Sequence, residues 1–226
     1  MNHSISAVQE KDGLVLINKP SGMTSHDVVN VARHAFGIRR IGHAGTLDPM
    51  ATGLLILGIG KSTKKLGNIT GSSKTYDAEI TLGASSTTDD KEGVIEKSGD
   101  TQPTLEQIKN VLEKFTGEIM QTPPIFSAIK VNGQRAYKIA RRGETIKMEP
   151  RKITIHKIEL VSYKYPILKI KTDVSSGTYI RSLARDIGKE FGTGAYLSKL
   201  ERTSIGEYKL ADAVELEKIK EAKLLT

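Results

Sequence analysis

The sequence predicts an α+β fold in which helices flank a mixed, largely antiparallel sheet. Strand-like segments outnumber helical ones along the 226 residues. The two kinds do not alternate regularly, whereas a doubly wound parallel sheet is built from alternating strands and helices. With 38% hydrophobic and 27% charged residues, the chain is long enough to bury a core in one or two domains.

The first two elements follow from apolar spacing and from the residues at their ends. The run 13–18 is typical of a buried strand, and Lys19-Pro20 ends it. Ser25 is expected to be the N-cap of a helix that Gly37 terminates. The apolar residues at helical spacing are Val28, Val29, Ala32 and Phe36.

Two further strands are predicted, each beside a polar segment. A glycine- and arginine-rich loop is expected over 37–48, and a second apolar strand over 54–59. Apolar and polar residues then alternate, which predicts a strand with one buried face. Its buried residues are Tyr76, Ala78, Ile80 and Leu82. The polar segment 83–103 is expected to be a loop.

The second half of the chain is predicted from capping and turn signals. Thr104 with Gln107 forms a capping box for a helix. The apolar residues of that helix are Leu105, Ile108, Leu112 and Phe115. Asn132-Gly133 indicates a tight turn. The remaining predictions are two strands within 151–174, a helix from Tyr179 to Phe191 and a short final helix near Ala213–Ala222.

Composition excludes several classes of function. The chain contains no cysteine, so disulfides, zinc ribbons and cysteine nucleophiles are excluded. The five histidines lack metal-ligand spacing, and we predict no metal site. Gly60-Lys61-Ser62 lacks the glycine that a phosphate-binding loop needs at position 55, so nothing supports a nucleotide hydrolase. Residues 1–11 do not form a secretory signal and no apolar run could span a bilayer, so we expect a cytoplasmic protein with no membrane partner.

The positive charge is concentrated in one segment. The formal net charge is +8, and a basic surplus favours a polyanionic partner. Segment 130–152 has eight basic and two acidic residues, a surplus of +6. These are Lys130, Arg135, Lys138, Arg141, Arg142, Lys147, Arg151 and Lys152 against Glu144 and Glu149. The segment is either a binding surface for a polyanion or an ordinary solvated face.

Asp48 is the one acidic residue between Val28 and Tyr76. Seven cations share that window: Arg33, Arg39, Arg40, Lys61, Lys64, Lys65 and Lys74. Nearby positive charge favours the ionised carboxylate, which suits a nucleophile or a base. The alternative is that Asp48 caps a helix with Pro49 at its first position. His43, the one histidine of the loop, is either a ligand contact or simply solvated.

Five short motifs occur in order between residues 13 and 210, and together they resemble the TruB-type tRNA pseudouridine synthases, which modify position 55 in the T loop. The first two are Lys19-Pro20-Ser21-Gly22-Met23-Thr24-Ser25 and Gly42-His43-Ala44-Gly45-Thr46-Leu47-Asp48-Pro49, the latter followed by Ala51-Thr52-Gly53. The others are Lys74-Thr75-Tyr76, Gly177-Thr178-Tyr179-Ile180-Arg181 and Leu200-Glu201-Arg202-Thr203 with Gly206.

The resemblance implies the pseudouridine synthase fold and a role for each matched residue. Asp48 matches the catalytic aspartate, and Arg181 the arginine that pairs with it. The substrate-binding positions are His43, Tyr76, Tyr179, Arg181 and Leu200, with Tyr76 stacking on the target base. Lys19 and Pro20 are expected to support the active-site loop. No cofactor is implied, and the expected partner is the T arm of tRNA, bound by a monomer.

Domain organisation is expected to be simple. Only 16 residues follow Leu210, so the chain is expected to be one catalytic domain over 1–226 without the C-terminal RNA-binding (PUA) domain of bacterial members. A basic insertion around 125–152 is expected to contact the RNA backbone, with Lys130, Arg135, Arg141, Arg142 and Arg151 as candidates. Two alternatives stay open: a guide-RNA-dependent synthase subunit, and a non-catalytic tRNA-binding or tRNA-folding module.

Overall fold

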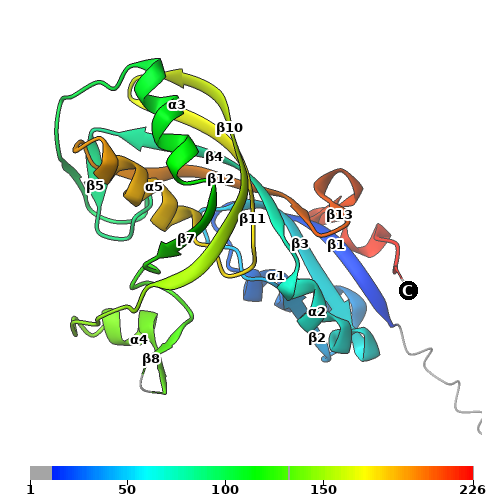
Figure 1. Ribbon diagram of the computed structural model, residues 1–226. Coiled ribbons are helices and arrows are strands. Elements are labelled where there is room, and N and C mark those ends of the chain that lie inside the picture. Colours follow the sequence, from blue (N-terminus) through cyan, green and yellow to red (C-terminus); the bar gives the residue numbers. More distant parts are fainter. Residues whose placement is uncertain (1–11, 132, 226) are drawn as a thin grey trace, which may run out of the picture. The chain divides into compact units, whose positions relative to one another are not determined.

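The computed structural model describes residues 12–131 and 133–225, which form two compact units (Figure 1). The first unit runs to Thr70 and resumes at Glu207; the second is Gly71–Gly206. Residues 1–11, on which the expectation about a secretory signal rests, lie outside the described part, as does Asn132 of the predicted turn. Among the described residues, no helix is long and apolar enough to cross a membrane.

The first unit is a small sheet with helical segments. Strand β1 pairs with β3 antiparallel and with β14 parallel, and β2 pairs antiparallel with β3. In chain order its elements are β1 (Gly13–Lys19), α1 (Ser25–Phe36), β2 (Ile41–Ala44), β3 (Thr52–Ile59), the 3-10 helix η1 (Gly60–Lys65), α2 (Leu66–Gly71), β13 (Tyr208–Lys209), η2 (Leu210–Asp212), β14 (Val214–Glu215) and η3 (Leu216–Glu221).

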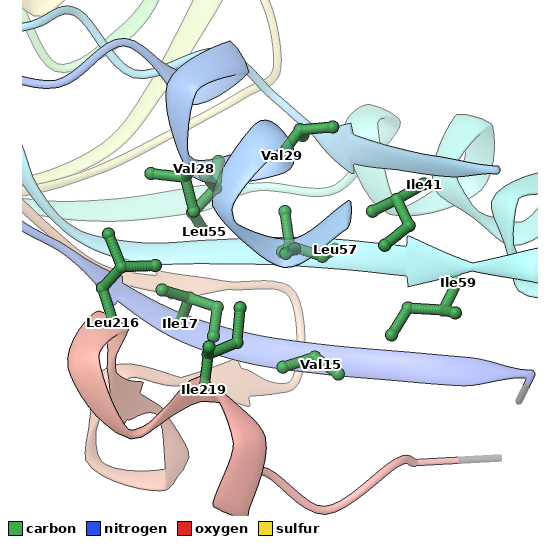
Figure 2. Close-up of a cluster of buried hydrophobic side chains, with 11 residues drawn as sticks. Val15, Ile17, Val28, Val29, Ile41, Leu55, Leu57, Ile59, Leu216 and Ile219 are labelled. Atoms are coloured by element: carbon green, nitrogen blue, oxygen red, sulfur yellow. The ribbon is translucent and has the colours of Figure 1, made fainter. Parts of the chain in front are cut away.

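One hydrophobic cluster holds this unit together (Figure 2). It joins α1 and η3 to the sheet, and each member is at most 6% exposed. The members are Val15, Ile17, Val28, Val29, Ala32, Ile41, Leu55, Leu57, Ile59, Leu216 and Ile219. Burying side chains of this kind stabilises a fold by about 1.5–3 kcal/mol each. The predicted strands 13–18 and 54–59 are therefore the core of the unit.

Helix α1 begins one residue earlier than predicted. Its N-cap is Thr24, not Ser25: the Thr24 hydroxyl accepts from the N–H of Asp27, and the Asp27 carboxylate accepts from the N–H of Thr24. This reciprocal pair is a capping box. Ser25 is buried and hydrogen-bonds to Leu47 instead. Gly37 ends the helix in the left-handed conformation at φ 68°, as the sequence predicts.

The second unit is an antiparallel sheet in the order β12-β4-β11-β10-β7. Its elements are β4 (Lys74–Leu82), β5 (Ala84–Ser86), β6 (Ile95–Lys97), α3 (Leu105–Lys114), β7 (Gly117–Gln121), β8 (Lys130–Val131), β9 (Gln134–Arg135), α4 (Ala136–Ala140), β10 (Arg151–Lys164), β11 (Ile167–Val174), α5 (Ile180–Glu190) and β12 (Ala195–Ile205). A mixed, largely antiparallel sheet with flanking helices confirms the predicted fold class.

Helices α3 and α5 pack against each other and against this sheet, α5 along β12 and α3 along β10 (Figure 1). The close approach of α5 to β12 requires Gly188, because a Cβ there would lie 2.2 Å from the backbone nitrogen of Ala195. The capping box of Thr104 and Gln107 is present at the start of α3, as predicted. On β4 the predicted alternation is observed, with Tyr76, Ala78, Ile80 and Leu82 buried.

Three predicted segments have a different structure. The loop over 37–48 contains strand β2, and the loop over 83–103 contains the β5–β6 hairpin. The final helix is the 3-10 helix η3, which begins at Leu216 and carries Leu216 and Ile219 inward. Strands β7 and β12 were not predicted. Short or heavily charged strands lack the clean apolar alternation that identifies a half-buried strand.

Candidate active site

The loop that carries Asp48 is fixed on both sides by buried residues. Leu47 and Met50 are 3% and 4% exposed. The Ser25 hydroxyl accepts from the N–H of Leu47 at 2.9 Å and lies 3.2 Å from the Leu47 carbonyl oxygen, to which it donates. The N–H of Ala51 returns to the Asp48 carbonyl at 3.1 Å. The side chain of Asp48 is thus carried on a rigid, partly buried loop.

Lys19 holds the same loop from the other side. Its side chain is completely buried, and Nζ donates to the carbonyl oxygens of Pro20, Met23 and Pro49 at 2.8, 2.7 and 3.3 Å. The N–H of Gly22 also donates to the Pro49 carbonyl, at 2.8 Å. A buried ammonium group is tolerated only where hydrogen bonds replace its water. Lys19 therefore connects the first motif to the loop of Asp48, and Pro20 supplies one of the three carbonyl acceptors that hold the Lys19 ammonium group.

The capping alternative for Asp48 is wrong. Pro49 and Met50 form a turn, and strand β3 begins at Thr52, so no helix starts at Asp48. His43 lies on β2, where its Cα partner across the strand pair is Leu57, and it is partly buried. The first unit thus carries four of the predicted site residues: Lys19, Pro20, His43 and Asp48.

The second unit brings the aromatic and apolar candidates together. On paired strands β4 and β12, Tyr76 is opposite Arg202 and Ala78 is opposite Leu200. Directly opposed residues point to the same face of a sheet, so the side chains of Tyr76, Leu200 and Arg202 share one face. Tyr76 and Leu200 are 6% and 8% exposed.

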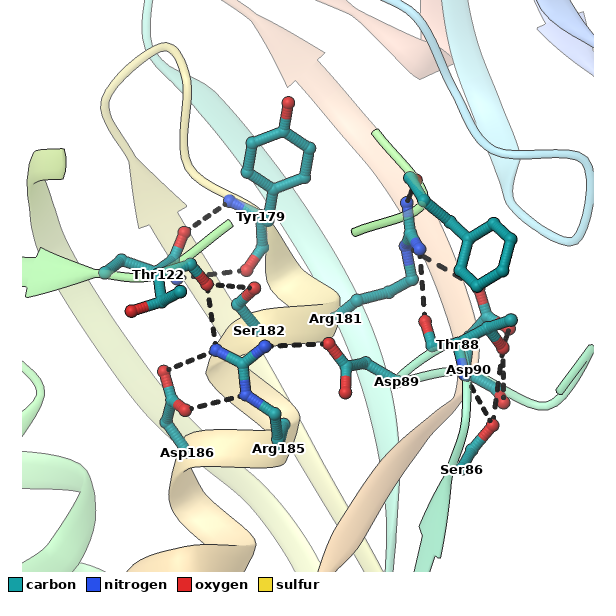
Figure 3. Close-up of polar contacts among 12 residues, drawn as sticks. Ser86, Thr88, Asp89, Asp90, Thr122, Tyr179, Arg181, Ser182, Arg185 and Asp186 are labelled. Atoms are coloured by element: carbon teal, nitrogen blue, oxygen red, sulfur yellow. Dashed lines mark hydrogen bonds and ion pairs between the residues drawn. The ribbon is translucent and has the colours of Figure 1, made fainter. Parts of the chain in front are cut away.

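Tyr179 occupies the position before α5, held by a side chain that the sequence did not single out. The amide of Gln121 accepts from the N–H of Tyr179 at 2.8 Å and donates to its carbonyl at 3.1 Å. Gln121 is 2% exposed. These two hydrogen bonds fix the backbone of Tyr179. Its ring is half-buried (Figure 3).

Arg181 is buried in a polar cage (Figure 3). Its Nη1 donates to the Thr88 carbonyl at 3.1 Å and its Nη2 to the Phe126 carbonyl at 2.9 Å. Its Nε lies 3.6 Å from a carboxylate oxygen of Asp90, and both side chains are about 5% exposed. Asp90 belongs to the segment predicted as a loop. Nothing in that polar stretch distinguishes it before the fold brings it to α5.

Lys74 is a further buried cation on β4. Its Nζ donates to the Ser72 carbonyl at 2.6 Å. Burial lowers the pKa of Lys74 to about 8, and the positive charge of the nearby Arg202 makes a smaller contribution in the same direction. Arg202 itself is 1% exposed. Both residues belong to the five motifs, but nothing in their sequence context indicates that their charges are buried.

The basic insertion lies between β7 and β10 and contains the β8–β9 hairpin and α4. Lys130, Arg135 and Arg151 are exposed; Arg135 donates to the Ala128 carbonyl at 2.9 Å. Arg141 lies over the Tyr137 ring, 5.6 Å from its centroid. Arg142 is paired with Glu144 at 2.5 Å, and the hydrogen bond between them raises the pKa of the guanidinium.

Among the described residues, no group of three or more His, Cys, Asp or Glu could hold a metal ion.

Two solved structures with this fold come from multi-component complexes. The chain superposes on a protein in a crystal structure of a Cbf5–Nop10–Gar1 complex with a TM-score of 0.73 and 29% identity, over 92% of this chain and 54% of that one. A structure of an H/ACA RNP bound to a substrate RNA containing 2′-deoxyuridine gives 0.70 and 27%, over 92% and 52%. The chain therefore spans about half the length of each.

The sequence profile of the TruB family pseudouridylate synthase N-terminal domain matches residues 33–180, and that of the tRNA pseudouridylate synthase B C-terminal domain matches residues 181–226. Fold and profile together define a pseudouridine synthase.

Relatives named tRNA pseudouridine synthase B agree with this class. One from Mycobacterium sp. (strain KMS) is 48% identical over 91% of this chain and 71% of its own length. Another from Arthrobacter sp. (strain FB24) is 49% identical over 92% and 71%. The chain belongs to the TruB family of pseudouridylate synthases.

Proposed function

We propose that this enzyme converts a uridine of tRNA to pseudouridine, at position 55 in the T loop, with Asp48 as the catalytic carboxylate. The observation that carries the proposal is the 48% identity, over 91% of the chain, to a relative named tRNA pseudouridine synthase B. The position in tRNA and the role of Asp48 rest on the motifs around residues 19–25 and 42–53.

The reaction is an isomerisation. The bond from N1 of uracil to C1′ of the ribose breaks, a bond from C5 to C1′ forms, and the proton on C5 is lost while N1 gains one. Atoms and electrons balance, so the reaction needs no redox cofactor. The protein must supply a carboxylate in a fixed position, and the hydrogen bonds that hold Leu47, Pro49 and Ala51 give the loop of Asp48 that rigidity.

The second unit is proposed to hold the target nucleotide. A uridine must leave its stack to react, which costs a few kcal/mol. Stacking on an aromatic ring returns about 1–3 kcal/mol per base. Tyr76 and Leu200 share a sheet face and can supply an aromatic platform and an apolar contact. Tyr179 and Arg181, at the start of α5, are proposed to contact the same nucleotide, and His43 is proposed to contact the T loop.

RNA affinity is proposed to come largely from the basic insertion. Lys130, Arg135, Arg141, Arg142 and Arg151 lie within or at the end of it, and phosphate contacts dominate RNA binding. Lys130 and Arg151 are exposed cations for this purpose, whereas Arg142 must exchange Glu144 for a phosphate. A monomeric cytoplasmic enzyme acting on the T arm is part of the same proposal.

The test is an incubation of the purified chain with an unmodified tRNA transcript, followed by mass mapping of pseudouridine. We expect modification at position 55 alone. Asp48→Asn should abolish it while tRNA affinity stays within a few fold. Asp77→Asn is the matched control, because Asp77 is an exposed aspartate on β4. Activity retained by Asp48→Asn would contradict the assignment of the carboxylate.

A second candidate is favoured by one observation. The solved structures with TM-scores of 0.70 and 0.73 come from an H/ACA RNP and a Cbf5 complex. The chain would then modify RNA only together with a guide RNA and protein subunits. The bare transcript distinguishes the two, because a guide-dependent subunit leaves it unmodified. A non-catalytic tRNA-binding module would also leave it unmodified, and would bind tRNA without any guide RNA.

A further inference from the structure

One turn after Arg181, helix α5 carries a second arginine that binds three acceptors at once (Figure 3). Arg185 Nη1 lies 2.8 Å from Oδ2 of Asp89, and its Nη2 donates to the Thr122 carbonyl at 2.8 Å. Its Nε and Nη2 also bind the two carboxylate oxygens of Asp186, at 2.9 and 3.3 Å. A planar guanidinium can serve acceptors in three directions, which an ammonium group on a flexible stem does not reproduce.

Asp89, whose carboxylate Arg185 binds, has an unfavourable backbone conformation. Asp89 has φ 62°, and it is the one non-glycine residue with positive φ in the described part of the chain. L-residues rarely adopt this left-handed conformation, although aspartate and asparagine tolerate it best. Such a conformation persists where the surroundings fix it. Here the Asp89 carbonyl accepts from Leu197 of β12 at 3.0 Å, and its carboxylate is bound by Arg185.

The residues on either side of Asp89 hold Arg181. The Thr88 carbonyl accepts from Arg181 Nη1, and the Asp90 carboxylate lies 3.6 Å from Arg181 Nε. Asp90 is fixed in turn by the Thr88 hydroxyl at 2.6 Å and by the N–H of Glu92 at 2.9 Å. The orientation of the Thr88 carbonyl and of the Asp90 carboxylate therefore depends on the backbone conformation of Asp89, which lies between them.

We propose that Arg185 is a positioning residue. It holds Asp89, and with it the turn Ser86–Gly93, in the conformation in which Thr88 and Asp90 orient the guanidinium of Arg181. The inference rests on the proposed function insofar as Arg181 acts at the site. It adds a second set of residues that hold Arg181 in place: Arg185 on α5 and the turn that contains Asp89.

The charges in this cluster make the arrangement sensitive to loss of Arg185. Asp89 faces Arg185, Arg181 and Asp186 on α5, and Asp90 is its neighbour on the turn. Burial raises the pKa of the Asp89 carboxyl, and the two arginines oppose that rise. Without Arg185 the carboxyl should therefore be protonated at a higher pH than in the wild type.

The test compares Arg185→Gln, Arg185→Lys, Asp89→Gly and Asp89→Asn with the wild type, well below each melting temperature. We expect the single-turnover rate of pseudouridine formation to fall about tenfold to a hundredfold in Arg185→Gln, with tRNA affinity within threefold. Arg185→Lys should recover only part of the rate. Asp89→Gly keeps the backbone conformation and loses the carboxylate, so it should resemble Arg185→Gln, while Asp89→Asn should be intermediate.

A matched control and a pH profile separate positioning from mere stabilisation. Lys114→Gln removes the exposed Lys114–Glu190 pair at the other end of α5 and should leave the rate unchanged. In Arg185→Gln the acid limb of the rate profile should move to higher pH. Wild-type rate and profile in Arg185→Gln would overturn the inference.

The inference can also fail independently of the enzyme activity. The N–H of Leu197 donates to the Asp89 carbonyl, and the N–H of Lys91 to the Leu197 carbonyl at 3.1 Å. In Arg185→Gln both amides should exchange with solvent at least tenfold faster than in Lys114→Gln. An inactive wild type would refute the proposed function. Unchanged amide exchange would refute the role of Arg185 whether or not the wild type is active.

Discussion

Four long cationic side chains are buried almost completely in the described part of the chain: Lys19, Lys74, Arg181 and Arg202. Burial of a charge costs several kcal/mol unless hydrogen bonds or counter-charges replace water. Lys19 and Lys74 donate to backbone carbonyls, and Arg181 to two carbonyls beside Asp90. Removing either partner of such an interaction should be costly.

Lys74 should make the stability of the protein depend on pH in the alkaline range. Its pKa is lowered to about 8 by burial, with a smaller effect from Arg202, while an unfolded lysine titrates near 10.5. Between these values the unfolded state binds more protons, so this residue's contribution to the free energy of unfolding rises with pH. Lys74→Met should flatten that rise, measured by urea unfolding from pH 7 to 10. Equal slopes in the two proteins would contradict the prediction.

Ser127 should be dispensable for stability. It is 4% exposed, and its hydroxyl has no hydrogen-bond partner among the described residues. An unsatisfied buried hydroxyl costs about 1–3 kcal/mol, so Ser127→Ala should leave the free energy of unfolding unchanged or raise it. Ser182→Ala is the matched control and should lose about 1 kcal/mol, because the Ser182 hydroxyl donates to the Thr122 carbonyl at 2.9 Å. The idea fails if both variants are destabilised by the same amount.

At the scale of elements, two neighbouring residues at the beginning of α1 have different roles, whereas the sequence predicted only capping, by Ser25. Thr24 caps the helix, whereas Ser25 binds Leu47 in the loop of Asp48. Thr24→Ala should cost about 1 kcal/mol and speed amide exchange in the first turn. Ser25→Ala should instead speed exchange at Leu47 and slow pseudouridine formation. Chemical unfolding and site-resolved amide exchange measure both, and the reverse pattern would show that the roles are interchanged.

Elements with a clean local pattern were predictable, and elements set by their neighbours were not. Strand β4 shows alternation and α3 shows a capping box, so the sequence locates both. Strand β12 mixes charged and apolar residues over Ala195–Ile205, and its identity depends on pairing with β4. Each strand of the β5–β6 hairpin is only three residues long, which is too short for a periodic pattern of apolar residues to be recognised.

The same division holds for the site. The motifs identified Asp48, Tyr76, Tyr179, Arg181 and Leu200 through resemblance to a family. The residues that hold them lie far away in sequence: Gln121 is 58 positions from Tyr179, and Thr88 is 93 positions from Arg181. A polar side chain of this kind looks like any loop residue until the chain is folded, because its partner is a backbone group with no sequence signature.

At the scale of the whole molecule, the excess charge of +8 is concentrated in the insertion rather than spread evenly. A surplus of +6 within 130–152 makes this segment the main electrostatic feature on which RNA binding can depend. Association with a polyanion releases counterions, so the logarithm of affinity falls linearly with the logarithm of salt concentration.

Neutralising two cations of the insertion should therefore change the slope as well as the affinity. Arg141→Gln with Arg142→Gln should weaken tRNA binding and reduce the slope by about 1–2, because each arginine that no longer neutralises a phosphate lowers it by about one unit. Arg142 must release Glu144 to reach a phosphate, so Arg141 is expected to account for the larger share. The single variants resolve the two contributions.

The matched control for this experiment is Lys109→Gln with Lys164→Gln, which removes the same charge from exposed positions on α3 and β10. This control should change the affinity for tRNA only slightly, through the electrostatic potential of the whole protein. It should leave the slope of log affinity against log salt concentration nearly unchanged, because attraction between charges is screened beyond about 8–10 Å at physiological salt. Equal slopes in the two double variants would mean that the insertion faces away from the bound RNA. Affinity would then arise from the other basic surfaces, and the cluster at 130–152 would be an ordinary solvated face.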